Sequence, residues 1–172
     1  MKNKSKVGII MGSDSDLEVF VETAKVLEEF GVPYDMTVGS AHRSPERVHS
    51  LVTGSSKHGI KLFIAGAGGA AHLAGVVASL TTLPVIGLPV KAKTLDGLDS
   101  LLSTAQMPPG IPVATVGINA GKNAGLLAIQ ILATFDKNLE KKLVSYKKKM
   151  ADEIEIKGEK LLKLGYKKYL EK

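Results

Sequence analysis

The stretch LFIAGAGGAAHL, residues 62–73, decides the fold of this chain. Its apolar start, Leu62–Ala65, predicts a buried strand, and the small residues from about Ala71 to Leu80 predict a helix. Within Ala65–Leu73, where the strand passes into the helix, His72 is the only polar side chain. A strand that passes through a glycine-rich turn into a helix is the repeating unit of a parallel α/β sheet. We therefore expect the turn to lie at the carboxyl end of a parallel strand, where open α/β sheets bind ligands.

The same alternation recurs along the rest of the chain. The polar ends Gly12–Asp16 and Ser40–Pro45 follow the runs Val7–Met11 and Tyr34–Val38. Strands are predicted at 7–11, 34–38, 62–65, 84–89 and 112–118, and helices at 16–30, 45–57, 71–80, 98–104 and 124–135. This order predicts a three-layer α/β fold with a flavodoxin-like parallel sheet in the strand order 2-1-3-4-5. Three polar strand ends would then meet on one rim.

The C-terminal segment has a different pattern. From residue 136 to 164 a single apolar stripe runs through lysine- and glutamate-rich sequence, which predicts one long helix of about 40 Å. The stripe consists of Leu139, Leu143, Tyr146, Met150, Ile154, Leu161 and Leu164. Because such a helix is longer than a small domain is wide, we expect it to pack on neighbouring subunits of a homo-oligomer. We predict a catalytic region at 1–135 and an oligomerisation helix at 136–172, both parts of one domain.

The composition excludes several classes of protein. Of the 172 residues 44% are hydrophobic, and no apolar run reaches the ~18 residues that a membrane helix needs. The basic segment 1–6 precedes a short strand rather than the apolar core of a signal peptide. The chain contains no cysteine, so no disulfide or thiolate metal site can form. We expect a cytoplasmic protein that does not bind membranes.

The net charge of +6 comes from the C-terminal segment alone. Residues 137–172 contain 12 Lys and 6 Asp or Glu, whereas residues 1–136 balance at 11 basic and 11 acidic side chains. Lysines on a long helix usually form a solvated face. None of the few aromatic residues lies in a basic strand that could stack bases. We therefore predict no binding of nucleic acid polymers.

Two of the polar strand ends carry the side chains needed to bind an anion and transfer a proton. The loop Gly12–Asp16 can present backbone N–H groups and the hydroxyls of Ser13 and Ser15 to an anion, although these residues could equally serve only to cap the next helix. His42 can take and give a proton near neutrality, and Arg43 can hold a phosphate or carboxylate. The alternative for this pair is a solvated surface turn before Pro45.

Three other patterns give weaker predictions. Gly66, Gly68 and Ala71 match a dinucleotide-binding spacing, but no acidic residue follows until Asp96, which argues against that site. Residues 117–123 narrowly miss a phosphate-binding loop, and a left-handed turn with a helix cap is the better interpretation. His49 and His58 have no carboxylate partners at ligand spacing, so we predict no metal site.

Six motifs, taken in order, resemble the PurE family over about residues 6–135. They are GSDSD at 12–16, SAHRSP at 40–45, AGAGGAAHL at 65–73, LPVIGLPV at 83–90, LDSLLS with QMP at 98–108, and KNAGLLA at 122–128. The resemblance implies a mutase of purine biosynthesis, which moves a carboxylate from the exocyclic nitrogen of an aminoimidazole ribonucleotide to ring carbon C4. It also implies no cofactor, no metal, and a homo-octamer whose subunits contribute to each other's sites.

The resemblance further implies roles for individual residues. His42 would transfer the proton, while Ser13, Ser15, Asp16, Ser40 and Arg43 would hold the ribose phosphate. The remaining residues expected to contact the substrate are Gly12, Ala41, Ala67, Gly68, Gly69, Ala70, His72 and Leu73.

The chain departs from the family pattern at Ala74, Ser44 and Pro109, where proline, threonine and a glycine or basic residue are usual. Arg43 and the glycine–alanine loop favour the mutase over the related carboxylase branch, which uses free CO2. A flavodoxin-like nucleotide-binding module without catalysis is the alternative from another class.

Overall fold

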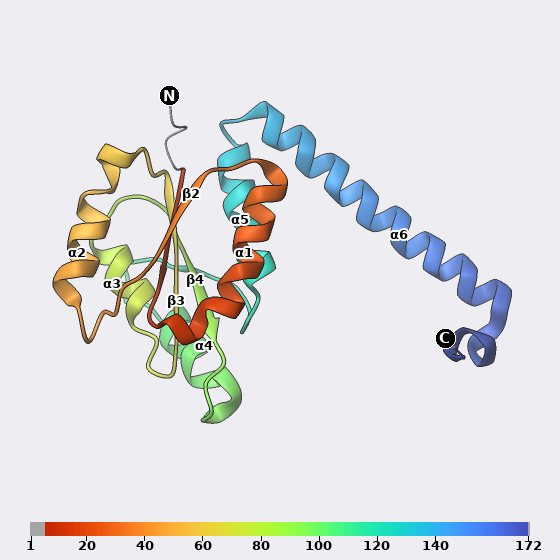
Figure 1. Cartoon of the computed structure of the whole chain (residues 1–172), viewed down its shortest axis with the longest axis horizontal. Helices are drawn as coiled ribbons and strands as arrows, with labels where there is room; N and C mark the ends of the chain where they lie inside the picture. The colour runs from red at the N-terminus through yellow and green to blue at the C-terminus, as the bar shows by residue number, and fades with distance from the viewer. Residues whose placement is uncertain (1–5, 172) are drawn as a thin grey trace. The chain divides into compact units, whose positions relative to one another are not determined.

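The computed structural model describes residues 6–171 and contains one parallel sheet, shown in Figure 1. Its strands are β1 (Val7–Met11), β2 (Tyr34–Val38), β3 (Leu62–Gly68), β4 (Val85–Val90) and β5 (Ala114–Thr115). They lie in the order β2-β1-β3-β4-β5 and all neighbouring strands are parallel. The predicted strand order is confirmed. Internal contacts divide the chain into two units, one ending at Leu132 and one beginning at Ala133. Each unit is described by itself.

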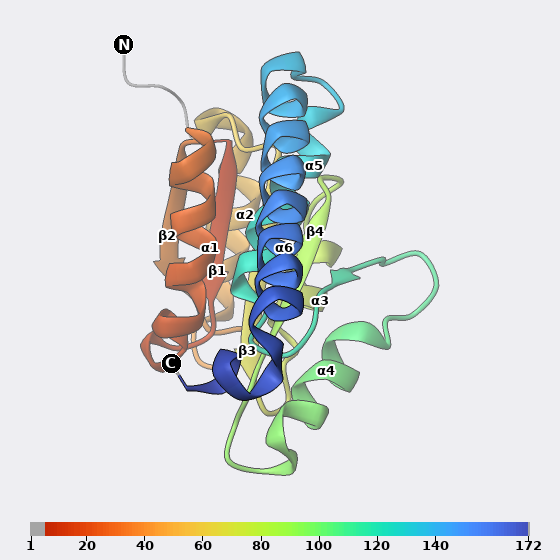
Figure 2. The same cartoon turned by 90° about the vertical axis from the view of Figure 1, so that its right-hand side faces the viewer.

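Five helices of the first unit cover or adjoin this sheet. They are α1 (Leu17–Phe30), α2 (Pro45–Thr53), α3 (Leu73–Ser79), α4 (Leu98–Ala105) and α5 (Gly121–Ala133). Figures 1 and 2 show α2 and α3 on one face of the sheet and α1 and α5 on the other. Since helices cover both faces, β1 and β4 are buried at every position, which explains their continuous apolar sequences. The three-layer architecture is therefore confirmed.

The core and the register hold the carboxyl ends of the central strands together. Phe63 of β3 packs with Val48 of α2 and Val77 of α3 in the main apolar cluster. Met11 lies opposite Val38 of β2 on one side and Gly66 of β3 on the other. β1 and β2 therefore end level with Gly66, two residues before the end of β3, and the loops that follow the three strands share one rim.

Some predicted element boundaries were wrong. β3 extends to Gly68 instead of Ala65, because small residues fit beside β4. β5 contains only Ala114 and Thr115 of the predicted 112–118; Pro112 has no N–H for the ladder. Helix α2 ends at Thr53, where the N–H of Gly54 bonds back to the helix, and a short 3-10 turn replaces the predicted last turn.

The second unit contains the long helix α6 (Lys137–Leu170). Asp136 caps it, since its Oδ1 accepts hydrogen bonds from the N–H groups of Asn138 and Leu139 at 3.0 and 3.3 Å. The helix continues beyond the predicted residue 164, with an interruption at Gly165, where φ is 69°. In the predicted stripe Leu139 is buried, three side chains are half-buried, and Met150, Ile154 and Leu161 are exposed. Within residues 6–171 no helix is both long and apolar enough to span a membrane.

Candidate active site

A pocket of about 520 Å³ opens at the carboxyl ends of four strands. The chain runs outward from β1 to β2 in one direction and from β3 to β5 in the other, so the switch point of the strand order lies between β1 and β3. The pocket opens there, where open α/β sheets bind their ligands. All predicted site residues except Gly69 line it: Gly12, Ser13, Ser15, Asp16, Ser40, Ala41, His42, Arg43, Ala67, Gly68, Ala70, His72 and Leu73. Tertiary structure thus brings together segments that are up to about 60 positions apart.

The loop after β1 forms a compact cap. The N–H of Ser15 donates to the hydroxyl of Ser13 (3.3 Å), and the N–H of Ser13 donates to Oδ2 of Asp16 (3.2 Å). This reciprocal arrangement is a capping box at the start of a 3-10 turn that leads into α1. The cap that these residues were predicted to form is therefore present. The hydroxyl of Ser15 donates to that of Ser13 at 2.9 Å, and both serines line the pocket.

Asp16 is the one buried carboxylate of the pocket, with 7% of its surface exposed. Burial raises the pKa of Asp16 above its ordinary value, and the nearby charge of Asp14 adds to this. The hydrogen bond from the N–H of Ser13 and the charge of Arg43 act in the opposite direction, but burial is the larger effect. The folded protein therefore holds this proton more tightly than the unfolded chain does.

Asp16→Asn tests this effect through the pH dependence of stability. Since the pKa is higher in the folded state, ionising Asp16 costs stability, and the wild type loses this contribution as pH rises from about 4, the unfolded pKa, through the folded value. The free energy of unfolding of the variant minus that of wild type should therefore increase between pH 3 and pH 7, because only the wild type loses stability over this range. Urea unfolding at several pH values measures this difference. A difference that stays constant with pH would contradict the assignment.

The loop after β2 is a tight turn built by two serines. The N–H of Arg43 donates to the hydroxyl of Ser40 (3.2 Å), and the N–H of Ser40 donates to the hydroxyl of Ser44 (3.1 Å). Ser44 thus supplies the hydroxyl that the usual threonine of the family motif would supply. The turn leaves the side chains of His42 and Arg43 exposed at the pocket.

His42 contacts His72 directly across the pocket. Nε2 of His42 lies 2.9 Å from Nδ1 of His72, and the rings meet edge to face at 89° with centroids 5.0 Å apart. One of the two nitrogens must carry the hydrogen and the other accept it. Arg43 connects the loop after β2 with the loop after β1, because its Nη2 donates to the carbonyl of Gly12 at 3.4 Å. The loops after β1, β2 and β3 are therefore joined through side chains.

The loop after β3 exposes backbone rather than side chains. Gly69 has a φ of +66°, a conformation that glycine adopts without strain, and it makes the turn behind the pocket wall. Gly69 is absent from the lining, whereas its neighbours Gly68 and Ala70 belong to it, and the contact of Gly69 with a ligand stays a prediction. His72 follows at the start of α3, and its N–H bonds to the carbonyl of Ala70 at 2.9 Å.

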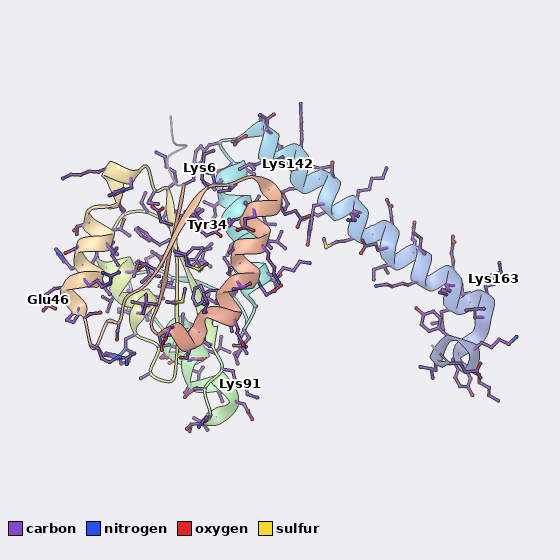
Figure 3. All side chains as sticks on the ribbon, in the orientation of Figure 1. Lys6, Tyr34, Glu46, Lys91, Lys142 and Lys163 are labelled. Carbon is purple, nitrogen blue, oxygen red and sulfur yellow. The ribbon has the colours of Figure 1, made fainter. Side chains whose placement is uncertain are left out.

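Sequence reasoning missed the fourth wall of the pocket, formed by Val90, Lys91, Ala92 and Lys93 after β4. Lys91, labelled in Figure 3, pairs with Asp96 at 2.7 Å, and its N–H donates to Oδ1 of Asn119 at 2.8 Å. The predicted strand order contained the signal for this wall, because the fourth strand lies next to the third and ends on the same rim.

The near phosphate-loop motif at 117–123 has a structural role in this wall. Asn119 takes a left-handed conformation (φ 54°), which confirms the predicted turn. Its N–H donates to the carbonyl of Pro89 at 2.9 Å, in addition to its bond with Lys91. The side chain thereby fixes the end of β4 beside the pocket.

The charges of the pocket favour an anion. Arg43, Lys91 and Lys93 line it with Asp16 as the single carboxylate of the lining. Over the range that the structure describes, no three His, Asp or Glu side chains are grouped so that they could hold a metal ion. The pocket can therefore bind an anionic small molecule through serine hydroxyls, backbone N–H groups and cationic side chains, and two histidines in contact with each other belong to its lining.

The fold and this pocket define a flavodoxin-like α/β protein with a small-molecule site at its switch point. The chain belongs to the AIR carboxylase family, whose model matches residues 6–153. This is the PurE family that the motifs predicted. The N5-carboxyaminoimidazole ribonucleotide mutase of Pyrococcus horikoshii is 56% identical over 97% of this chain and 94% of that protein. The mutase of Thermotoga maritima is 54% identical over 96% of each.

Two further comparisons are informative. The crystal structure of Treponema denticola PurE has a TM-score of 0.83 at 33% identity and covers 91% of this chain and 98% of that one. The phosphoribosylaminoimidazole carboxylase of Saccharomyces cerevisiae is 53% identical over 98% of this chain, which matches only 29% of that longer protein.

Proposed function

We propose that this chain is a mutase that converts N5-carboxyaminoimidazole ribonucleotide to 4-carboxy-5-aminoimidazole ribonucleotide in de novo purine biosynthesis. This proposal is supported mainly by two findings that agree. Relatives with this activity in their names align over nearly their whole length, and four of the six family motifs contribute residues, His42 among them, to the lining of one pocket. A mutase is an isomerase, so no second substrate is consumed.

We expect a ribonucleotide to bind with its phosphate beside β1 and β2 and its base beside β3. The part of the pocket beside β1 and β2 is lined by Ser13, Ser15, Ser40 and Arg43, and the ribose phosphate would bind there. Asp16 would accept hydrogen bonds from the ribose. The base would then lie against the Ala67–Leu73 wall, beside the two histidines.

The reaction balances within one substrate molecule. The bond between N5 and its carboxylate breaks, CO2 is released into the pocket, and N5 takes up a proton. C4 then attacks the CO2, a carbon–carbon bond forms, and C4 loses its proton. The glycine–alanine wall supplies an apolar surface that favours loss of the carboxylate charge, and confinement keeps CO2 at a high effective concentration.

His42 would carry the proton between the two positions. One proton moves from C4 to N5 overall, so a single acid–base group can donate in the first half and accept in the second. The 2.9 Å contact places His72 where it can share a hydrogen with His42 and orient its ring. His42 is therefore the proposed catalytic residue.

A direct turnover assay tests the proposal. The protein is incubated with N5-carboxyaminoimidazole ribonucleotide without ATP or bicarbonate, and absorbance of the C4-carboxylated product is followed. We expect conversion that does not change when free CO2 is removed. The same protein with aminoimidazole ribonucleotide and bicarbonate is the comparison reaction.

The second candidate function is carboxylation of aminoimidazole ribonucleotide by free CO2. Its support is the 53% identity to yeast carboxylases, whose matching part is less than a third of their length. Activity in the bicarbonate reaction alone would establish this function instead. Activity in neither reaction would leave a nucleotide-binding module.

A homo-octamer in the cytoplasm is the proposed state of the protein. The apolar side chains that α6 exposes, among them Met150 at 41% and Ile154 at 66%, support contacts with other subunits. Light scattering on the full chain measures the mass. A monomer would overturn the proposed role of the helix, whereas Ile154→Lys should reduce assembly without unfolding the sheet domain.

A further inference from the structure

We propose that Ser103 is a positioning residue for the proposed reaction: its hydroxyl fixes the turn before His72 and so sets the contact of His72 with His42. The inference rests on the proposed function for its kinetic part. Ser103 lies on α4 and does not line the pocket, so it acts through other residues.

The hydroxyl of Ser103 both donates and accepts a hydrogen bond. Three carbonyls lie within reach of its proton: that of Asp99, four residues earlier in the same helix, at 2.8 Å, that of Ser100 at 3.3 Å, and that of Gly69 in the pocket loop at 3.4 Å. The oxygen accepts the N–H of Ala71 at 3.0 Å. Because the hydroxyl has one proton and the carbonyl of Asp99 is its nearest acceptor, the oxygen keeps its lone pairs for the N–H of Ala71. The helix therefore presents a preset acceptor to the pocket loop.

The N–H of Ala71 needs this acceptor. Ala71 is 1% exposed and follows the left-handed turn at Gly69. A buried N–H without a partner is costly, so removal of the hydroxyl favours a different path for the turn. His72 is the next residue, and its ring makes the 2.9 Å contact with His42. A shift in the turn is transmitted to the two rings directly.

A second serine on the same face of α4 supports this role. Ser100 is fully buried, and its hydroxyl lies 2.9 Å from the carbonyl of Val90 and 2.8 Å from that of Gly97. Helix α4 thus holds the loop after β4 through Ser100 and the loop after β3 through Ser103. The motif residues at 98–103, which contribute no side chain to the pocket, gain a physical role.

The kinetic test compares three variants of Ser103 with one control. Ser103→Ala should lower kcat about tenfold with KM changed less than threefold, since misplacement of reacting groups costs rate. Ser103→Cys, of similar size but a weak acceptor, should behave in the same way. Ser103→Thr, which keeps the hydroxyl, should restore kcat. The matched control is Ser50→Ala on α2, because the hydroxyl of Ser50 donates to the carbonyl of Glu46 in its own helix and Ser50 does not line the pocket.

A spectroscopic test does not depend on turnover. In the protein without substrate, ¹⁵N signals of the rings of His42 and His72 should shift in Ser103→Ala, while those of His49 and His58 stay unchanged. Unchanged His42 and His72 signals would overturn the proposal, as would a kcat within twofold of wild type or an equal loss in Ser50→Ala. If wild type shows no mutase turnover, the proposed function fails, and the ring signals still decide the positioning role.

Discussion

Replacing His42 by asparagine is expected to lower kcat by about 10²–10⁴-fold, the usual contribution of a positioned acid–base group. Asparagine keeps a polar side chain but cannot carry a proton between N5 and C4. Because His42 is exposed at the pocket rather than packed in the core, the free energy of unfolding should change by no more than about 0.5 kcal/mol. Ligand binding should be retained.

Steady-state kinetics and calorimetric titration with the reaction product measure the two effects separately. His49→Asn is the matched control, since His49 is exposed on α2 and does not line the pocket. Turnover by His42→Asn within tenfold of wild type would assign the proton transfer to another group. Loss of binding together with turnover would indicate a binding role for His42.

Gly66→Ala is expected to produce the largest loss of stability, about 3 kcal/mol, at the upper end of the usual cost of overpacking. Gly66 is buried in β3 and pairs with Leu88 of β4. An added Cβ would collide with the carbonyl oxygen of Leu88 and come within 3.0 Å of its carbonyl carbon. Because both are backbone atoms of a central strand, they cannot move aside without separating the two strands.

The loss corresponds to a decrease in Tm of about 6–12 °C, measured by thermal unfolding. Gly158→Ala on α6 is the control, and its stability should change in the opposite direction, because no neighbouring atom lies within 4 Å of its added Cβ. That variant should gain about 0.5–1 kcal/mol from the higher helix propensity of alanine. If both variants changed stability in the same direction, close packing at Gly66 would not be the cause.

The boundaries show where local sequence and tertiary structure disagree. Val7–Met11 and Tyr34–Val38 were predicted without error, because apolar or alternating runs bounded by glycine and proline mark strand ends clearly. β3 was predicted too short because its last three residues, Gly66–Gly68, have low strand propensity. They are nevertheless paired, residue by residue, with Leu88–Val90. Close approach between backbones favours these small residues, and that requirement exists only once β4 is in place.

The sequence by itself determined the strand order, the rim on which the loops meet, and the residues of three loops, since periodicity and motif spacing carry this information locally. Tertiary structure decided the rest. The 2.9 Å contact between His42 and His72, the fourth wall from Val90 to Lys93, and the hydroxyl of Ser103 behind Ala71 each join segments distant in the chain. Their geometry depends on strand register and helix packing, which no local pattern encodes.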